Sequence, residues 1–298
     1  MQTRPCLAFD SELTEVLKSL KEKTDKKLLA VTAEIPNDEL RAKIEYAVTG
    51  GKRVRPVITL LACEVVGGRW SDGLNAAVAV ELLHCSSLVH DDIMDQATLR
   101  RGRETLFSRF GASFAILAGD LLVALAFRMI ERLPRELQGN LLHELTDAFA
   151  DLCQGQHDDL RFSAHDNCKD SSCEQVSLLK TARLFEAAAS VGARLGSGDE
   201  QLVSALTLFG RNLGMAYQIV DDTIDALGNE DVAGKSVGQD SRNGRRTIVL
   251  SLSRSQTAPT FLVDKHTNAA CEALEALPQT LARNRLISLA YLLAQRKT

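Results

Sequence analysis

Apolar residues recur at helical spacing along most of this chain. The segments with this spacing are residues 76–95, 113–133, 135–160, 173–196 and 199–227. Several of these segments are apolar almost all the way round, which is typical of helices buried at the centre of a bundle. An alternating strand pattern with a hairpin signal is not evident. The pattern predicts an all-α fold of roughly ten or more helices.

Proline and glycine positions support long helices and a single domain. Prolines are absent from residues 57–133 and 135–258. Residues 37–51 begin with Asn37, a favourable N-cap, and end on paired glycines, which predicts a helix with both ends defined. The expected loops lie near residues 67–73, 103–110, 163–173 and 227–245. No stretch rich in proline, glycine and serine is long enough to divide the chain, so residues 1–298 are predicted to form one domain.

Composition excludes some classes of function. The 298 residues are 45% apolar and 25% charged, which is typical of a folded protein with a sizeable core. The net charge is −4, basic residues are scattered and aromatic residues make up 5%, so nucleic-acid binding is not expected. An anionic ligand would therefore need a local cluster of basic residues, because the overall field does not attract it.

The cysteines and the N-terminal segment favour a cytoplasmic protein. The seven cysteines are odd in number and irregular in spacing, as in proteins of reducing compartments. His165, Cys168 and Cys173 lie close together, but no second ligand pair accompanies them, which favours a polar loop over a metal site. The first 16 residues lack an apolar stretch of signal-peptide length. No run reaches the roughly 18 apolar residues of a spanning helix, so stable membrane insertion is not expected.

Two identical acidic motifs carry the chemistry. DDIMD at 91–95 and DDTID at 221–225 each end a strongly apolar segment, and within each motif the first and last aspartates share a helix face. A single acidic turn is common on an exposed helix. Two such turns at the ends of apolar helices instead predict that both clusters lie at the mouth of a buried cavity. The first aspartate cluster is Asp91, Asp92 and Asp95, and the second aspartate cluster is Asp221, Asp222 and Asp225.

Metal and diphosphate binding follow from the donor types. Carboxylate oxygens without histidine or cysteine partners suit Mg²⁺, which takes one or two carboxylates together with substrate phosphates. Cations and nearby glycines suggest diphosphate binding and are numerous enough to hold two anions, one on metal and one held by cations alone. These cations are Lys52, Arg53, Arg55, Arg100, Arg101, Lys180 and Lys235.

Seven motifs in the order of a known family occur between residues 50 and 240. They are GGKRVRP (50–56), HCSSLVHDDIMD with LRRG (84–102), GDLLVALA (119–126), GQHDDL (155–160), KTARLFEAA (180–188), GMAYQIVDDTID (214–225) and GKSVGQD (234–240). With these motifs the chain resembles the head-to-tail trans-isoprenyl diphosphate synthases, or polyprenyl synthetases. One departure is GRRTIVL, where the family often has a Lys-Thr-Pro segment and where Arg245 or Arg246 replaces the lysine.

The resemblance implies a fold, a reaction and an assembly. The fold is an isoprenoid synthase-type helical bundle around a central apolar cavity, usually in a homodimer. The reaction extends an allylic diphosphate with isopentenyl diphosphate by ionisation, condensation and elimination, with two to three Mg²⁺ ions. By position, Asp91, Asp95 and Asp221 are the main Mg²⁺ contacts, and the other aspartates of both clusters complete the catalytic set. The released diphosphate is the expected base.

The resemblance also implies two groups of substrate contacts. The isopentenyl diphosphate site would be Lys52, Arg55, His84 and Arg101. The contacts of the allylic substrate or its diphosphate would be Arg100, Lys180, Thr181, Gln218 and Lys235. Lys180, Thr181 and Gln218 would also take part in catalysis, with Thr181 and Gln218 stabilising the carbocation by their dipoles.

Product length depends on how far the cavity extends below Asp91. Ser86 and Ser87 lie about one turn before Asp91, where bulky aromatic residues give short products in the family. Candidate floors are Leu83, Val80 and, on a facing helix, Phe127 and Met129. We expect geranylgeranyl diphosphate, and a polyprenyl diphosphate of C25 or longer is the alternative.

Two further functions share parts of this pattern. A class I terpene cyclase has one DDxxD motif, but its second metal motif mixes Asn, Ser or Thr with Glu, and it needs no second diphosphate site. A non-catalytic partner subunit of a synthase typically loses part of an aspartate cluster. Both clusters are intact here, so a catalytic synthase is the favoured interpretation.

Overall fold

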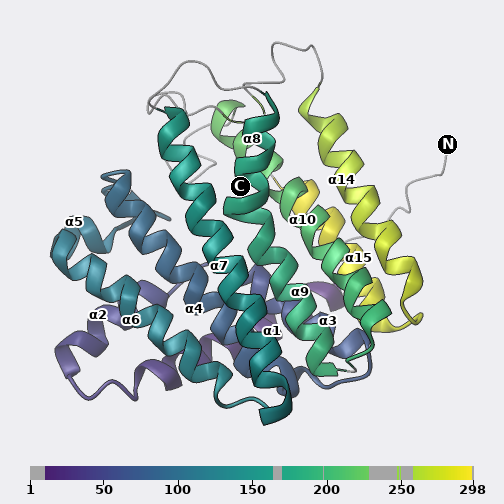
Figure 1. Cartoon of the computed structure of the whole chain (residues 1–298), viewed down its shortest axis with the longest axis horizontal. Coiled ribbons are helices and arrows are strands. Elements are labelled where there is room, and N and C mark those ends of the chain that lie inside the picture. Colours follow the sequence, from purple (N-terminus) through teal and green to yellow (C-terminus); the bar gives the residue numbers. More distant parts are fainter. Residues whose placement is uncertain are drawn as a thin grey trace.

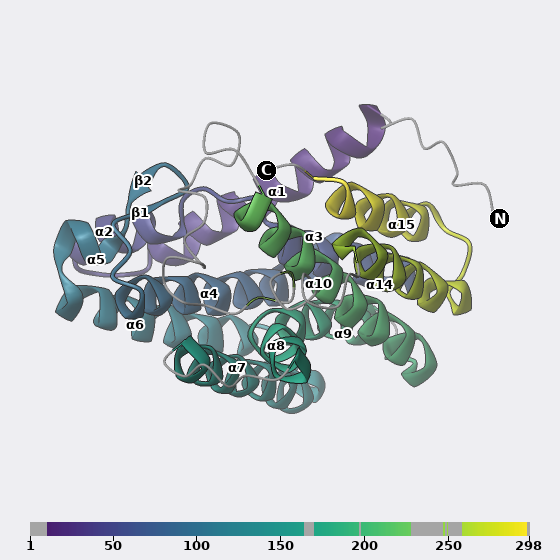
Figure 2. The same cartoon turned by 90° about the horizontal axis from the view of Figure 1, so that it is seen from above.

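Helices dominate the chain, as predicted. The computed structural model describes residues 11–163, 170–196, 198–227, 247, 249 and 258–296. The elements in chain order are α1 (Ser11–Thr32), α2 (Asp38–Val48), α3 (Val54–Val65), α4 (Trp70–Met94), β1 (Leu99–Arg100), β2 (Arg103–Glu104), α5 (Leu106–Phe110), α6 (Ala112–Ile130), α7 (Arg135–Ser163), α8 (Asp170–Ser177), η1 (Leu178–Ala182), α9 (Arg183–Gly196), α10 (Glu200–Leu227), α14 (Pro259–Ala273), η2 (Leu274–Ala276) and α15 (Leu281–Ala294). Figures 1 and 2 show their arrangement.

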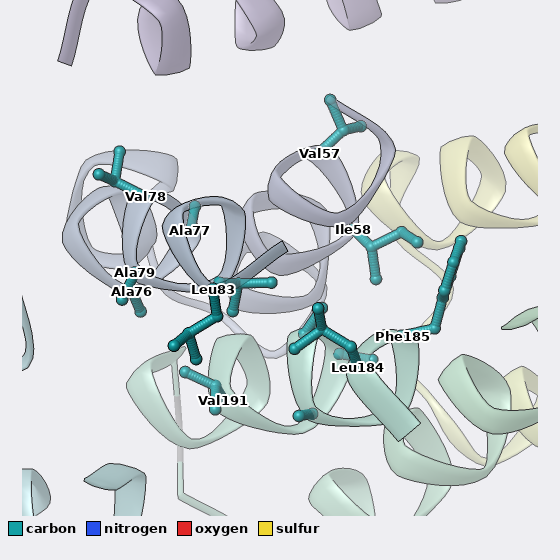
Figure 3. Packing of buried hydrophobic residues seen from close by; sticks show 14 of the residues in the cluster. Val57, Ile58, Ala76, Ala77, Val78, Ala79, Leu83, Leu184, Phe185 and Val191 are labelled. Atoms are coloured by element: carbon teal, nitrogen blue, oxygen red, sulfur yellow. The ribbon is translucent and has the colours of Figure 1, made fainter. Parts of the chain in front are cut away.

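The core forms where α3, α4 and α9 pack together. Figure 3 shows apolar side chains of these three helices meeting in the interior. Ile58, Leu83 and Phe185 are completely inaccessible to solvent. Removing a side chain of this size from water contributes about 1.5–3 kcal/mol. Helix α4 is buried on most of its circumference, which explains why its sequence is apolar almost all the way round.

Glycines let helix backbones approach one another closely. A methyl group added to Gly192 of α9 would overlap the carbonyl oxygen of Thr59 on α3. A methyl group on Gly214 of α10 would lie 2.6 Å from the Cα atom of Ala182. These contacts are shorter than any side chain permits, so glycine sets the distance between the helices at both points.

Helix α2 has the N-cap and the terminal glycines that the sequence predicts. The side chain of Asn37 accepts a hydrogen bond of 2.8 Å from the backbone amide of Leu40, as expected of an N-cap. After the helix, Gly50 and Gly51 have φ angles of 89° and 91°. Glycine adopts this left-handed region without steric cost, so the chain can turn sharply before α3.

The backbone departs from the sequence predictions at several places, and α5 and the first residues of α4 and α8 lie in segments predicted as loops. Residues 173–196 show one continuous helical pattern, but a π-helical turn, η1, interrupts it between α8 and α9. Residues 99–104 contain a short antiparallel hairpin that the pattern did not indicate. Its turn residues Arg101 and Gly102 have φ angles of 56° and 71°, as a tight two-residue hairpin turn requires. Two-residue strands are too short to produce an alternating pattern.

Helix α6 contradicts the expectation that no segment of the chain is long and apolar enough to span a membrane. Among the described residues it is the one helix long and apolar enough to cross a membrane by length and composition, with 19 residues and a mean hydropathy of 1.9. It contains Asp120 and Arg128 and packs against α4 through Gly119. Its apolar character therefore also suits a helix that is partly buried against its neighbours.

Substitution of Gly192 by alanine should destabilise the fold. The added methyl group overlaps the Thr59 carbonyl oxygen, and the helices must separate to accommodate it. We expect a loss of about 2–3 kcal/mol in the free energy of unfolding, measured by urea denaturation. Gly139→Ala on α7 is the matched control, because a methyl group there meets nothing within 4 Å. Helix propensity alone should make that control about 0.5–1 kcal/mol more stable.

Candidate active site

One cavity brings together most of the site residues predicted from the sequence. Its volume is about 850 Å³. The predicted residues that line it are Lys52, Arg55, His84, Ser87, Asp91, Asp95, Arg100, Arg101, Lys180, Thr181, Gln218, Asp221, Asp222 and Asp225. Five of the six aspartates in the two clusters thus line a single cavity although the clusters are far apart in the chain, and buried Asp92 is not among the lining residues. Lys235 lies outside the described residues.

The hairpin brings Arg100 onto the first aspartate cluster. Helix α4 ends at Met94, and the chain returns through β1 and β2. The Nε atom of Arg100 donates a 2.7 Å hydrogen bond to Oδ1 of Asp92, and its Nη2 atom donates a 3.3 Å bond to Oδ2 of Asp91. Burial raises the pKa of Asp92 to about 6, and the charge of Arg100 opposes this rise. Arg100 therefore offsets part of the repulsion among the aspartates.

The π-helical turn places Lys180 against the same cluster from the other side. The Nζ atom of Lys180 lies 3.3 Å from Oδ1 of Asp91 and 2.8 Å from Oδ2 of Asp159. Gly155 of α7 permits this approach, because a methyl group there would lie 2.5 Å from the backbone nitrogen of Lys180. A single π turn inside a helix is common at functional sites. Asp159 was not assigned from the sequence, although the GQHDDL motif contains it.

A chain of hydrogen bonds links η1 to the second aspartate cluster. The hydroxyl of Thr181 donates a 2.7 Å hydrogen bond to Oε1 of Gln218. The Nε2 atom of Gln218 donates a 2.6 Å bond to Oδ1 of Asp222, one turn further along α10. Two polar uncharged side chains are thereby held in a fixed orientation at the wall of the cavity.

Arg296 is a site residue that the sequence interpretation missed. Its Nη2 atom donates hydrogen bonds of 2.9 Å to Oδ1 of Asp221 and 3.1 Å to the carbonyl oxygen of Tyr217. Its guanidinium group also lies 3.7 Å from the ring centroid of Tyr217. Arg296 follows α15, close to the end of the chain, where no motif marked it. Tertiary packing alone brings it to the cavity.

Arg55 and His84 form a pair at the cationic side of the cavity. Nη1 of Arg55 donates to Nε2 of His84 over 3.3 Å, and the guanidinium group lies 4.4 Å from the ring centroid of Phe185. Burial, followed by the charge of Arg55, holds the pKa of His84 well below its ordinary value, so His84 is neutral at pH 7. With Lys52 and Arg101, this pair is called the cation subsite below.

The cations of the cation subsite lie close enough to one another, and to Arg296, for their positive charges to repel. Desolvation, with the nearby charge of Arg296, lowers the pKa of Lys52. The Nε atom of Arg55 is buried and has no hydrogen-bond partner among the described residues. A buried donor of this kind is costly unless a ligand satisfies it. The arrangement therefore favours an anion at this side of the cavity.

The aspartate clusters suit a metal held jointly with a ligand. Among the described residues, no group of three or more His, Cys, Asp or Glu side chains is arranged to hold a metal ion. The cavity-lining donors of both clusters are carboxylate oxygens, the type that Mg²⁺ prefers. Mg²⁺ commonly binds one or two carboxylates and completes its coordination with water and phosphate oxygens. The donor set thus fits Mg²⁺ bridged to a diphosphate, and a preformed protein cage is not needed.

The residues predicted to set product length occupy different environments. Ser87 lines the cavity, and its hydroxyl donates a 2.8 Å hydrogen bond to the carbonyl oxygen of His84. Ser86 and Leu83 are completely buried, and Phe127 on α6 is 38% exposed. Of these four described residues, Ser87 alone is among the residues that line the cavity. Their effect on product length stays a prediction.

Comparisons with known proteins identify the family that this chain resembles. The polyprenyl synthetase family model matches residues 37–279. A short chain isoprenyl diphosphate synthase from Methanothermobacter thermautotrophicus is 36% identical over 241 residues, which are 80% of this chain and 74% of that protein. A geranylgeranyl diphosphate synthase from Sulfolobus acidocaldarius is 35% identical over 246 residues, covering 81% of this chain and 73% of that protein.

A solved structure shows the same similarity. The geranylgeranyl pyrophosphate synthetase from Pyrococcus horikoshii superimposes with a TM-score of 0.89 at 33% identity, over 96% of this chain and 98% of that one. The family model and the relatives agree with one another, and the solved structure has the same fold. The chain therefore belongs to the polyprenyl synthetase family and is a prenyltransferase.

Proposed function

We propose that this prenyltransferase condenses isopentenyl diphosphate with an allylic diphosphate, head to tail, and that its main product is geranylgeranyl diphosphate. The observation that carries this proposal is the single cavity lined both by the two aspartate clusters and by the separate cation subsite. Such a cavity can hold two diphosphates at once. The relatives named geranylgeranyl diphosphate synthase support the substrate class and the product.

The two diphosphates take different sides of the cavity. Isopentenyl diphosphate binds at the cation subsite, where neutral His84 and buried Arg55 offer hydrogen-bond donors without a metal. The allylic diphosphate binds between the aspartate clusters, beside Arg100 and Lys180. Lys235 adds a contact there by the family motif. This separation keeps the diphosphate that leaves the allylic substrate apart from the diphosphate of isopentenyl diphosphate, which the product retains.

Two to three Mg²⁺ ions would be held by Asp91, Asp95 and Asp221, with the remaining aspartates of both clusters completing the set. When bound, they supply positive charge to the diphosphate that leaves the allylic substrate. Arg100 and Lys180 stabilise the same developing negative charge with N–H donors that already lie at the site. Because these donors are held by Asp91 and Asp92, little reorganisation is needed as the C–O bond breaks.

The protein protects and orients the carbocation. Thr181 and Gln218 present oriented dipoles to it, since their hydrogen bonds fix both side chains. Apolar lining residues such as Leu88, Leu152 and Ile224 limit access of water to the cation. The double bond of isopentenyl diphosphate attacks the cation, and the released diphosphate accepts the proton lost in the final step.

Product length, assembly and location complete the proposal. Small Ser87 leaves room for a chain of about twenty carbons, in keeping with the geranylgeranyl relatives.

The exposed side of α6 carries Ile116, Leu117 and Phe127, which are 48%, 63% and 38% exposed, and a second copy of the chain would cover them in a homodimer. The odd and irregularly spaced cysteines favour a cytoplasmic location.

The first test is a product assay with Asp91→Asn. Purified protein is incubated with Mg²⁺, isopentenyl diphosphate and, in separate reactions, dimethylallyl, geranyl or farnesyl diphosphate, and the dephosphorylated products are sized. We expect Asp91→Asn to lower kcat by about 10²-fold or more, and a chelator to abolish the reaction. Asp147→Asn on α7 is the control and should keep full activity, since Asp147 is exposed and does not line this cavity. Wild-type protein that elongates none of the primers would instead indicate a non-catalytic partner subunit.

A second test concerns the wall of the cavity at Ser87. Ser87→Phe places an aromatic ring in the path of the growing chain, so the main product should shorten from C20 to about C15, with Ser→Phe filling the space of roughly one isoprene unit. The products are sized as above, with Phe127→Ala alongside. Unchanged products in Ser87→Phe together with longer products in Phe127→Ala would place the floor on α6.

The dimer is tested by charge on the exposed side of α6. Leu117→Asp should dissociate the dimer, because a buried unpaired carboxylate is unfavourable in an interface. Sedimentation equilibrium measures the mass of each variant. Leu208→Asp on α10, where the leucine is 50% exposed, is the control and should leave the mass unchanged. Wild-type protein that sediments as a monomer would contradict the proposed assembly.

A further inference from the structure

Arg53 lies between two residues of the cation subsite but points the other way. Lys52 and Arg55 line the cavity, whereas the side chain of Arg53 is 1% exposed and lies in the interior. Its backbone is left-handed, with φ 55° and ψ 37°, at the N-terminal end of α3. Residues other than glycine adopt this conformation at an energetic cost, and they do so mainly where the surroundings enforce it.

The guanidinium group of Arg53 donates hydrogen bonds to residues of three helices. Nε of Arg53 donates a 2.7 Å hydrogen bond to Oδ1 of Asp25 on α1, and Nη1 donates a 2.6 Å bond to Oε1 of Glu81 on α4. Nη2 donates to the carbonyl oxygen of Val48, the last residue of α2. The planar, fork-shaped guanidinium reaches all three acceptors through three different nitrogens, and the compact ammonium group of a lysine does not match their spacing.

The network is continuous with the cation subsite through α4. Glu81 precedes His84 by three residues, so the two side chains lie on neighbouring positions of one helix face. Arg53 binds Glu81, and Arg55 binds His84. Two adjacent residues on the face of α4 therefore each hold an arginine from the short segment 53–55.

The same segment also supports Arg101. Gly51 has a φ angle of 91°, and a methyl group added to it would overlap the guanidinium group of Arg101. Arg101 is thus packed directly on the backbone of the turn that precedes Arg53. A shift of this turn would move Lys52, Arg55 and the support of Arg101 together.

Stability is a poor explanation for this buried network. Taking charges out of water is costly, and well-packed apolar residues often replace a buried ion pair without loss of stability. The left-handed backbone at Arg53 adds a further cost. A network that is costly in two ways, and that adjoins the cation subsite, is better explained by the geometry that it enforces.

We propose that Arg53, held by Asp25 and Glu81, is a positioning residue for the cation subsite. The network fixes residues 50–55 in the conformation that directs Lys52 and Arg55 into the cavity. It thereby sets the affinity for the diphosphate that binds without metal, and has little effect on the metal-bound diphosphate. The identification of that ligand as isopentenyl diphosphate rests on the proposed function.

Steady-state kinetics of Arg53→Lys and Arg53→Met test this proposal. Lysine keeps the charge but loses the three hydrogen bonds to α1, α2 and α4. Even this conservative variant should therefore bind isopentenyl diphosphate more weakly than wild type. We expect the KM for isopentenyl diphosphate to rise about tenfold or more, as small displacements of binding groups commonly cause. The KM for the allylic substrate should stay within about twofold, since that site does not depend on this segment.

Arg194→Met is the matched control for a general loss of stability. Arg194 also binds two carboxylates, those of Glu144 and Glu200, but it lies near the far end of α9. Its variant should lower Tm without changing either KM. If Arg53→Lys lowered Tm and likewise left both KM values unchanged, Arg53 would be merely structural and the proposal would be wrong.

A binding measurement separates this inference from the proposed function. Isopentenyl diphosphate is titrated calorimetrically into the full chain with chelator present and no allylic substrate, so that binding depends on cations alone. Weaker binding by Arg53→Lys than by wild type supports the inference even if no primer is elongated. Equal binding overturns it even if wild type is an active synthase. Failure of wild type to bind under these conditions would overturn this inference alone, because the product assay tests the proposed function.

Discussion

Six carboxylates at one cavity are the constraint on which this structure depends. Like charges at this density repel one another, and a poorly solvated carboxylate is unfavourable without a counter-charge. The fold supplies that charge from the hairpin after α4 and from two distant parts of the chain. Arg100 and Lys180 bind Asp91, and Arg296 binds Asp221. The segments that contain Lys180 and Arg296, both remote in sequence from the aspartates that they bind, must therefore reach the ends of α4 and α10.

Irregular backbone delivers these cations. Lys180 lies in the π-helical turn η1, and Arg100 comes from a hairpin whose turn contains Arg101 in a left-handed conformation. Regular helices around them provide the rigid frame, packed closely through glycines such as Gly155 and Gly192. Departures from regular geometry cost energy and persist where surrounding contacts enforce them. At η1 and the hairpin they occur where charge must be directed into the cavity.

The cation pairs have a second consequence for substrate binding. A donor already held beside a carboxylate loses little conformational freedom when a diphosphate arrives. Arg100 and Lys180 thus pair with carboxylates before the diphosphate binds and with the diphosphate afterwards. On the opposite side, Arg53 is fully engaged in the interior by Asp25 and Glu81, so it can act on the ligand only through its neighbours. The two sides of the cavity are organised by different networks.

The sequence by itself determined the fold class and most of the charged residues that line the cavity in the described part of the chain. Helical periodicity is strong in α7, α9 and α10, α4 and α6 are long apolar segments, and the aspartate clusters are contiguous, so each could be recognised locally. Short-range rules could not reveal η1 or the hairpin, because two-residue strands and a single π turn leave no periodic signal. The sequence also gave no reason to select Asp159 beyond the acidic pair in its motif.

Only the tertiary structure decided which charges meet. Arg296 binds Asp221, and Arg53 joins Asp25 to Glu81, across chain separations that no local pattern encodes. Arg53 illustrates the difference, since the sequence placed it with the diphosphate-binding cations and the structure places it in the interior. Residue type and spacing specify what a side chain can do, whereas its direction depends on backbone dihedral angles and helix packing, which are properties of the whole fold.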